Sequence, residues 1–205
     1  MRWWPVLAVV AGCSFHFNSA GTAPTDTSRP DDAPSDARID ADAAPDAGFD
    51  PATCPASYTT TVTATPGSRY RVIATAQDWG SQRADCEDDL AGATHLVVFD
   101  SDAEAQQIAA AVGAINYHVG AVQPAGESGV AVGWVWLTGA PVPSGLWQAG
   151  QPNDNDGIED DEQDRTSVYA SVGYALQDVD APFSTQAVCE CDGHPVAPAV
   201  LAILQ

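Results

Sequence analysis

The chain has 205 residues and a formal net charge of -21 at pH 7, because it carries 28 acidic side chains and only 7 lysine or arginine side chains. Partners held through anionic phosphates would be repelled, so nucleic acids and anionic membrane surfaces are disfavoured. The length suits one ordinary domain, and 15 prolines with 17 glycines indicate that part of the chain does not fold.

Residues 1–12 are predicted to be an export signal. Arg2 precedes an apolar run from Trp3 to Ala11, which is far shorter than the roughly 20 residues that a membrane span requires. The residues "VAGC" that end at Cys13 resemble the bacterial lipobox, which implies a lipid anchor at Cys13 as the only membrane contact. A simple secretory signal is the alternative. We therefore expect export to a bacterial cell envelope, as an outer-membrane lipoprotein or a secreted protein.

Residues 13–53 are predicted to form a disordered stalk. They are mostly Ala, Asp, Pro, Ser and Thr, and such a segment buries too little apolar surface to offset the entropy lost on ordering. Proline and like-charge repulsion extend a segment of this kind. The stalk would therefore hold the following domain away from Cys13.

Four cysteines follow the stalk: Cys54, Cys86, Cys189 and Cys191. An even number in an exported chain favours two disulfides, for which three connectivities exist. A zinc site is the alternative, but it would need paired C-x-x-C knuckles or nearby histidines, and the spacing of the histidines provides neither.

The first elements expected after the stalk are a hairpin and a helix. Residues 57–65, "SYTTTVTAT", alternate like a half-buried strand, and Pro66 and Gly67 supply a turn before the returning strand 70–75, "YRVIAT". The segment 78–92 then has apolar residues at near-helical intervals, with Gly92 as the stop.

A strand at 95–99 and a second helix at 101–112 come next, and Ser101 and Glu104 have capping-box spacing. Short strands and a long loop region follow up to the closing segment 186–192. This order predicts an α+β fold with two helices, short antiparallel sheets and a loop region too long to lack a purpose. The sequence contains no nucleotide-binding or nucleophile-elbow motif, and no enzyme activity is predicted. We assign no function to the apolar tail 193–205.

Several linked motifs identify a family. Trp79 and Ala84 precede Cys86, "GATHLVVF" follows, and residues 134–153 read "WVWLTGAPVPSGLWQAGQPN". With these spacings, residues 54–192 resemble a C-type lectin-like domain. The resemblance implies that fold, and it implies a disulfide between Cys86 and Cys189, which leaves Cys54 and Cys191 to pair by elimination.

The resemblance also implies a site for Ca2+. Its ligands would be Gln151, Asn153, Glu159, Gln177 and Asp178, with a cis peptide bond between Gln151 and Pro152. Calcium prefers six to eight oxygens from carboxylates, amides and water, which suits these residue types. Two neighbouring sugar hydroxyls would complete the shell and hydrogen-bond the same five side chains, so these five are also the predicted carbohydrate-binding residues.

The chain departs from the family pattern at several positions. Gln-Pro-Asn is a hybrid of the two usual sugar-specific motifs and leaves the sugar open. Gln177 replaces an asparagine, Leu176 replaces a tryptophan, and Asp161 and Ala181 stand where the family has a second disulfide. The predicted function is calcium-dependent carbohydrate binding at a bacterial surface. The alternative is a calcium-independent protein-interaction module on the same fold.

Two further groups of residues have simpler predicted roles. The remaining carboxylates of the 154–164 loop are predicted to be solvated, and Trp134, Trp136 and Trp147 are predicted to be core residues and not a sugar-stacking surface.

Overall fold

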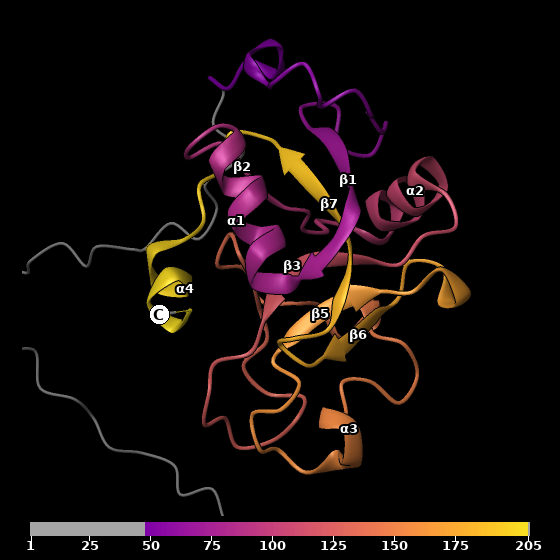
Figure 1. Ribbon diagram of the computed structural model, residues 1–205, viewed down its shortest axis with the longest axis vertical. Helices are drawn as coiled ribbons and strands as arrows, with labels where there is room; N and C mark the ends of the chain where they lie inside the picture. Colours follow the sequence, from indigo (N-terminus) through magenta and orange to yellow (C-terminus); the bar gives the residue numbers. More distant parts are fainter. Residues whose placement is uncertain (1–47, 205) are drawn as a thin grey trace, which may run out of the picture. The chain divides into compact units, whose positions relative to one another are not determined.

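Figure 1 shows the computed structural model of the protein, which describes residues 48–204. The predicted export signal 1–12, the Cys13 anchor and nearly all of the stalk 13–53 lie outside the described residues. Between residues 48 and 204, none of the helices has the length and apolar character that a membrane crossing requires.

The described residues form an α+β fold, as predicted. The helices are α1 (Trp79–Asp89), α2 (Asp102–Val112), α3 (Asp154–Gly157) and α4 (Pro198–Ile203), and the short 3-10 helices are η1 (Pro51–Thr53), η2 (Ser144–Leu146) and η3 (Ala170–Val172). The strands are β1 (Arg69–Asp78), β2 (Thr94–Leu96), β3 (Tyr117–Val122), β4 (Val135–Trp136), β5 (Arg165–Val168), β6 (Leu176–Val179) and β7 (Ser184–Cys191).

One sheet contains all of these strands, with β7 near its centre. The strand order is β1-β7-β3-β5-β6, while β2 pairs with β7 and β4 pairs with β3. The pairs are antiparallel except for β3 with β7, which run parallel over two registered residue pairs. The sheet is therefore mixed, and β5 and β6 carry it toward the loops around α3 (Figure 1).

The predicted strand at 57–65 is wrong. This segment makes only an isolated bridge between Thr60 and Tyr70, and β1 instead pairs along β7, from Arg69 opposite Cys191 to Asp78 opposite Ser184. The alternation of residues 57–65 is a local pattern, whereas the long buried partner strand comes from the other end of the domain. Tertiary pairing therefore overrides the local strand signal.

Both predicted helices are present, and each begins after a capping side chain. Asp78 caps α1 by accepting a hydrogen bond from the Ser81 N–H at 2.9 Å. Ser101 caps α2 by accepting from the Glu104 N–H at 3.2 Å. The Glu104 carboxylate does not complete the capping box, because its oxygens accept from the Asp100 N–H at 2.7 Å and the Tyr70 hydroxyl at 2.6 Å.

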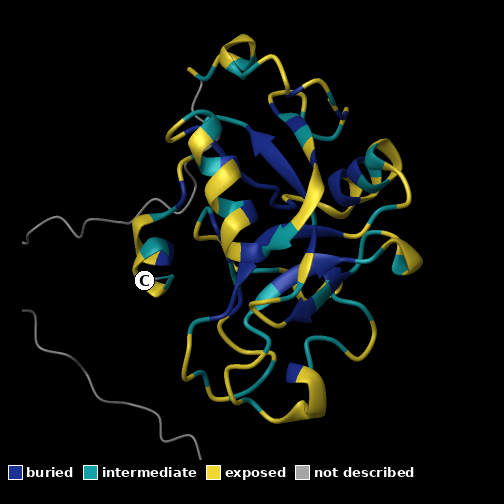
Figure 2. Ribbon diagram, viewed as in Figure 1, coloured by how far each residue is buried: buried dark blue, intermediate teal, exposed yellow. Residues whose placement is uncertain are grey.

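Buried residues are concentrated in the strands of the sheet, while α1 and α2 carry both buried and exposed residues (Figure 2). Trp134 and Trp136 are buried, as predicted, and Trp147 is partly buried against the same core. Trp134 and Trp147 meet edge to face, with ring centroids 4.8 Å apart. The Trp79 Nε1–H donates to the Val119 carbonyl at 2.8 Å, so this aromatic side chain ties α1 to β3.

Both disulfides have the predicted pairing. Cys86 of α1 is bonded to Cys189 with 5.4 Å between Cα atoms, and Cys54 is bonded to Cys191 with 6.0 Å between Cα atoms. The two β7 cysteines are two residues apart, so they lie on the same face of the strand. Strand β7 is thus cross-linked both to α1 and to the start of the domain.

The packed region extends beyond residues 54–192 at both ends. Phe49 packs against the core beside Gly193. In the tail, the Ala197 N–H donates to the Leu137 carbonyl at 2.8 Å, and Val200 of α4 is buried. The segment from 193 to 204 is therefore part of the folded domain.

Candidate functional site

The loop between β4 and β5 carries the predicted metal-binding motif. Its Gln151–Pro152 peptide bond is cis, as the resemblance implies. A cis bond is accessible here because the second residue is proline. The bond reverses the chain between the two amide side chains of the motif, Gln151 and Asn153.

Four of the five predicted ligands border one hollow of about 230 Å³: Gln151, Asn153, Gln177 and Asp178. The first two come from the loop and the last two from β6. We call this recess the amide hollow. Its other lining residues are Asn155, Gln163, Tyr169, Val179, Asp180 and Phe183.

Two residues that line the amide hollow each have an acceptor atom that is buried without a hydrogen-bond partner in the described structure: Gln151 Oε1 and Asp178 Oδ1. The other Asp178 oxygen accepts from the N–H groups of Asn153 and Asp154, both at 2.7 Å. An unpaired buried acceptor costs free energy, so native structures rarely retain one without a water or an ion. A hard cation such as calcium suits these oxygens.

The strand carboxylate of the amide hollow is partly desolvated. Burial raises the pKa of Asp178, and the two N–H groups from the loop oppose that rise by stabilising the charged form. Asp178 therefore links β6 to the loop and also contributes negative charge to the hollow.

The remaining two amides keep acceptor capacity. Asn153 Oδ1 accepts from the Asn155 N–H at 2.9 Å, and a carbonyl oxygen has a second lone pair. Gln177 Nε2 donates to Gln148 Oε1. In the described part of the chain, Gln177 Oε1 accepts none of the hydrogen bonds, so this oxygen is also available to a ligand.

Glu159, the fifth predicted ligand, does not line the amide hollow. Its carboxylate accepts from Gln123 Nε2 at 3.0 Å and from the Asp161 N–H at 3.3 Å. It belongs to a separate group with Asp161 and Asp164, whose oxygens all lie within 4.8 Å of one another. We call this group the acidic cluster.

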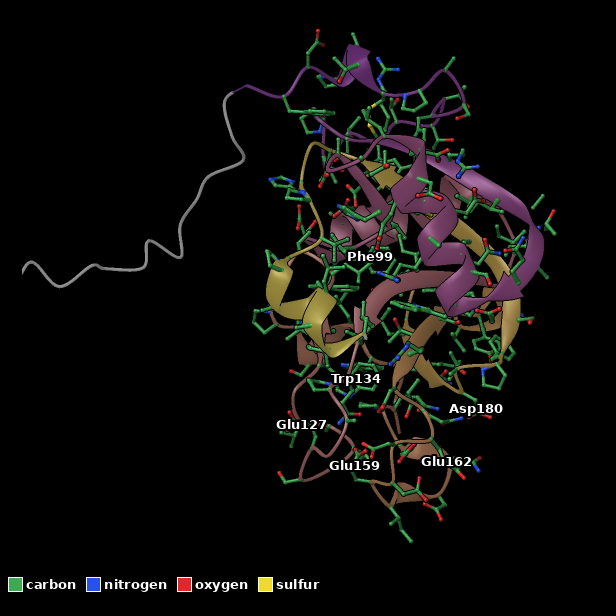
Figure 3. All side chains as sticks on the ribbon, turned by 60° about the vertical axis from the view of Figure 1, so that its left-hand side comes forward. Phe99, Glu127, Trp134, Glu159, Glu162 and Asp180 are labelled. Atoms are coloured by element: carbon green, nitrogen blue, oxygen red, sulfur yellow. A yellow bond between two sulfur atoms is a disulfide. The ribbon has the colours of Figure 1, made fainter. Side chains whose placement is uncertain are left out.

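The acidic cluster connects two loops. Asp161 Oδ1 accepts from the Gly126 N–H at 2.7 Å, and Figure 3 labels Glu127 and Glu159 in the loop region below Trp134. Asp164 Oδ1 is buried without a partner in the described structure, and burial raises the pKa of Asp164 to about 6. Its ionised carboxylate is therefore poorly compensated by the protein alone.

Asp154 is a site residue that sequence reasoning missed. It was predicted to be solvated, but its side chain is buried, and its two oxygens accept from the N–H groups of Gln163 at 2.7 Å and Asp160 at 2.8 Å. Its own N–H donates to Asp178. Asp154 thus holds the loop of residues 154–164, which we call the acidic loop, against β6. No local pattern distinguishes it from the exposed Asp156, because the distinction arises only when the loop closes.

Comparisons with known proteins place this geometry in a fold family. A scan of protein-family models and a search of curated proteins found no match. Among solved structures, a calcium-independent type II antifreeze protein is 25% identical with a TM-score of 0.53, over 67% of this chain and 92% of that chain. The mouse scavenger receptor C-type lectin carbohydrate-recognition domain is 25% identical with a TM-score of 0.52, over 67% and 96%. The chain folds as a C-type lectin-like domain.

Other C-type lectin structures agree on the fold. CEL-I from Cucumaria echinata has a TM-score of 0.55 at 19% identity, over 67% of this chain and 96% of that chain. A complex of SPL-1 with GlcNAc has a TM-score of 0.53 at 20% identity, over 68% and 96%. The neighbours of this C-type lectin-like domain thus include carbohydrate-binding proteins and one protein that is named calcium-independent.

A second recess of about 320 Å³ adjoins the amide hollow of the C-type lectin-like domain. Gln151 contributes to the lining of both recesses. Trp134, Trp147 and Val142 also line the second one. An apolar wall beside a polar hollow suits a ligand with one hydroxylated and one hydrocarbon face.

Proposed function

We propose that this domain binds a carbohydrate with the help of a calcium ion at the amide hollow. The observation that carries the proposal is that two residues lining the same recess each hold a buried, unpartnered oxygen, Gln151 Oε1 and Asp178 Oδ1. Structural similarity to carbohydrate-recognition domains supports it.

In this proposal, the residues of the amide hollow hold the ion and contact the sugar. Gln151, Asn153, Gln177 and Asp178 would hold the ion, and Glu159 remains a proposed ligand whose carboxylate is bonded to Gln123 in this structure. A bound calcium ion supplies coordination positions for two neighbouring sugar hydroxyls. The side-chain amides donate to those hydroxyls, and the carboxylates accept from them.

We also propose that the domain is exported and displayed on a bacterial cell envelope. The sequence features that support this are the apolar run before Cys13, the lipobox-like "VAGC" and the Asp/Ala/Pro-rich segment that follows. Two disulfides agree with an oxidising compartment. An outer-membrane lipoprotein and a secreted protein both fit these features.

Thermal unfolding with and without calcium tests the metal site. Calcium should raise the Tm, because an ion that binds only the folded state stabilises it by about 2.7 kcal/mol at a concentration of 100 times Kd. The double variant Gln151→Ala, Asp178→Asn should lose this shift. Glu162→Gln removes an exposed loop carboxylate and should retain it. An unchanged Tm across a calcium titration of the intact chain would exclude the calcium site.

A glycan array then tests carbohydrate binding itself. We expect signals for particular sugars that disappear with a chelator and return with added calcium. The Gln-Pro-Asn motif leaves the preferred sugar open, so the array must include both mannose-like and galactose-like ligands. Binding that persists in the chelator would contradict a role for the ion.

A calcium-independent protein-interaction module is the second candidate. It is favoured by the position of Glu159 outside the amide hollow and by the similarity to an antifreeze protein named calcium-independent. In that case the melt would show no calcium response and the array no sugar signal, while the fold would remain intact by circular dichroism.

A further inference from the structure

A second group of metal-ligating side chains lies where β2 meets the end of β7. His95 is directly opposite Glu190 in the antiparallel pairing of these strands. Side chains two residues apart in a strand point the same way, so Glu190 and Asp192 approach His95 from one face. The ligating atoms of His95, Glu190 and Asp192 all lie within 4.8 Å of one another.

A hydrogen bond to the backbone orients the ring of His95. Its Nδ1 lies 2.8 Å from the Leu96 carbonyl oxygen, which can only accept, so Nδ1 carries a hydrogen and donates. In the neutral ring, Nε2 then has a lone pair. Nε2 is fully buried without a hydrogen-bond partner in the described structure, and it faces Asp192 Oδ1 at 3.3 Å. A lone pair directed at a carboxylate is unfavourable unless a cation lies between them.

We propose that His95, Glu190 and Asp192 bind a divalent transition-metal ion of the zinc type. One imidazole and two carboxylates are donors that zinc accepts, at roughly 2.0 to 2.2 Å each. When both are ionised, the two carboxylates carry two negative charges, which a divalent ion would balance in a region where uncompensated charge is costly. Donors around such an ion lie roughly 3.4 Å apart, so the three side chains need to close only slightly around it.

The surroundings of the three ligands are those of an oriented metal site. Asp192 Oδ2 accepts from His194 Nδ1 at 2.8 Å, and Asp192 Oδ1 accepts from the His194 N–H at 2.8 Å. Glu190 Oε2 accepts from the Val98 N–H at 3.3 Å. Such second contacts fix the orientation of ligands and typically change metal affinity by about 10- to 100-fold. The His194 side chain is 43% exposed, so an ion can reach the group from solvent on this side.

The competing occupant is a proton on His95 Nε2. It would give a buried ion pair between His95 and Asp192, as the 3.3 Å separation allows. The two possibilities differ in metal content, and that difference makes the proposal testable without knowledge of any sugar ligand.

The experiment uses the full chain, stripped of metal, incubated with zinc chloride and then passed through a desalting column. We expect mass spectrometry of the elements to find one zinc ion per chain. Cobalt used in place of zinc should give intense visible absorption, because low-coordinate cobalt sites with nitrogen and oxygen donors absorb more strongly than hydrated cobalt.

Substitutions locate the ion. His95→Gln should abolish retention, and His194→Ala should weaken zinc binding by about 10- to 100-fold. His118→Gln is the matched control, because it removes another buried histidine that is not part of this group. Glu159→Gln and Asp164→Asn control for zinc in the acidic cluster, and His16→Ala controls for zinc near the start of the chain. All four controls should retain zinc.

Some variants could fail to fold, so a measurement on the unaltered protein accompanies them. Cobalt bound at the proposed place broadens the ring signals of His95 and His194 in NMR spectra and spares those of His118. The proposal is overturned if the native chain retains no zinc, if folded His95→Gln retains it, or if cobalt leaves the His95 signals unchanged.

Discussion

At the scale of single residues, Asp154 helps to order the acidic loop. Its buried carboxylate accepts two backbone N–H groups, from Asp160 and Gln163. Asp154→Ala leaves both donors without this partner and should lower the free energy of unfolding by about 1 to 3 kcal/mol. Denaturant unfolding measures this loss, and amide hydrogen exchange should become faster at Asp160 and Gln163.

Glu162→Gln is the matched change for Asp154→Ala, since Glu162 is an exposed carboxylate of the same loop. It should leave both measurements unchanged. Equal effects of the two substitutions would contradict a structural role for Asp154.

Asp164 makes the stability of the folded domain depend on pH. Burial raises its pKa from 3.8 in the unfolded chain to about 6 in the folded protein, so the folded state binds the proton more tightly. Ionisation of Asp164 thus disfavours folding, and this penalty is absent below 3.8 and fully present above 6. In a chelator, Asp164→Asn should raise the Tm at neutral pH and have no effect near pH 3.8.

The exposed Asp156 provides the control, because Asp156→Asn should not reproduce the pH-dependent gain. An increase in Tm for Asp164→Asn that is the same at both pH values would show that ionisation is not its cause.

The spacing of motifs in the sequence predicted the four ligand residues that line the amide hollow, but not the position of Glu159. Gln151, Asn153, Gln177 and Asp178 belong to short motifs whose order along the chain reflects how a loop meets a strand, and the structure brings them to one recess. The position of Glu159 depends on its partner Gln123, which lies 36 residues away. Contacts of this range leave no periodic pattern in a sequence.

At the scale of elements, α4 stabilises the domain although its sequence suggested no role. Val200 is buried in the core cluster, while its neighbour Ala199 is exposed. Val200→Ser should cost about 2 kcal/mol, because it removes buried apolar surface and introduces a hydroxyl. Thermal or denaturant unfolding measures the loss.

Ala199→Ser makes a change of similar chemistry on the exposed side of α4 and should be nearly neutral. If both substitutions were neutral, α4 would not be docked in solution.

Elements with local signals were predicted better than elements with distant partners. The caps Asp78 and Ser101 mark the starts of α1 and α2, and each acts within three residues. The alternation at 57–65 has the same local character but yields only one bridge, because β7 provides β1 with a longer partner. Residues 57–65 and β7 are separated by most of the domain, and local propensity carries no information on that choice.

At the scale of the whole molecule, the proposed lipid anchor at Cys13 would determine where the domain is held. If Cys13 carries lipid, Cys13→Ser should abolish incorporation of a labelled fatty acid and move the protein from the membrane fraction to the soluble fraction of a bacterial host. Ser14→Ala is the neighbouring control and should leave both readouts unchanged. Absence of label from the unaltered chain would favour the simple secretory signal, and unaltered labelling in Cys13→Ser would contradict a lipid at Cys13.

The Cys54–Cys191 bridge has a directional consequence for the folded domain. The first described residues and the bridge lie at one end of the domain, while α3 and the loops of the amide hollow lie at the other (Figure 1). A pulling force on the chain ahead of Cys54 would therefore be transmitted through the disulfide to β7 and not to the amide hollow. A domain held from that end points its recess outward, toward whatever approaches from the surrounding medium.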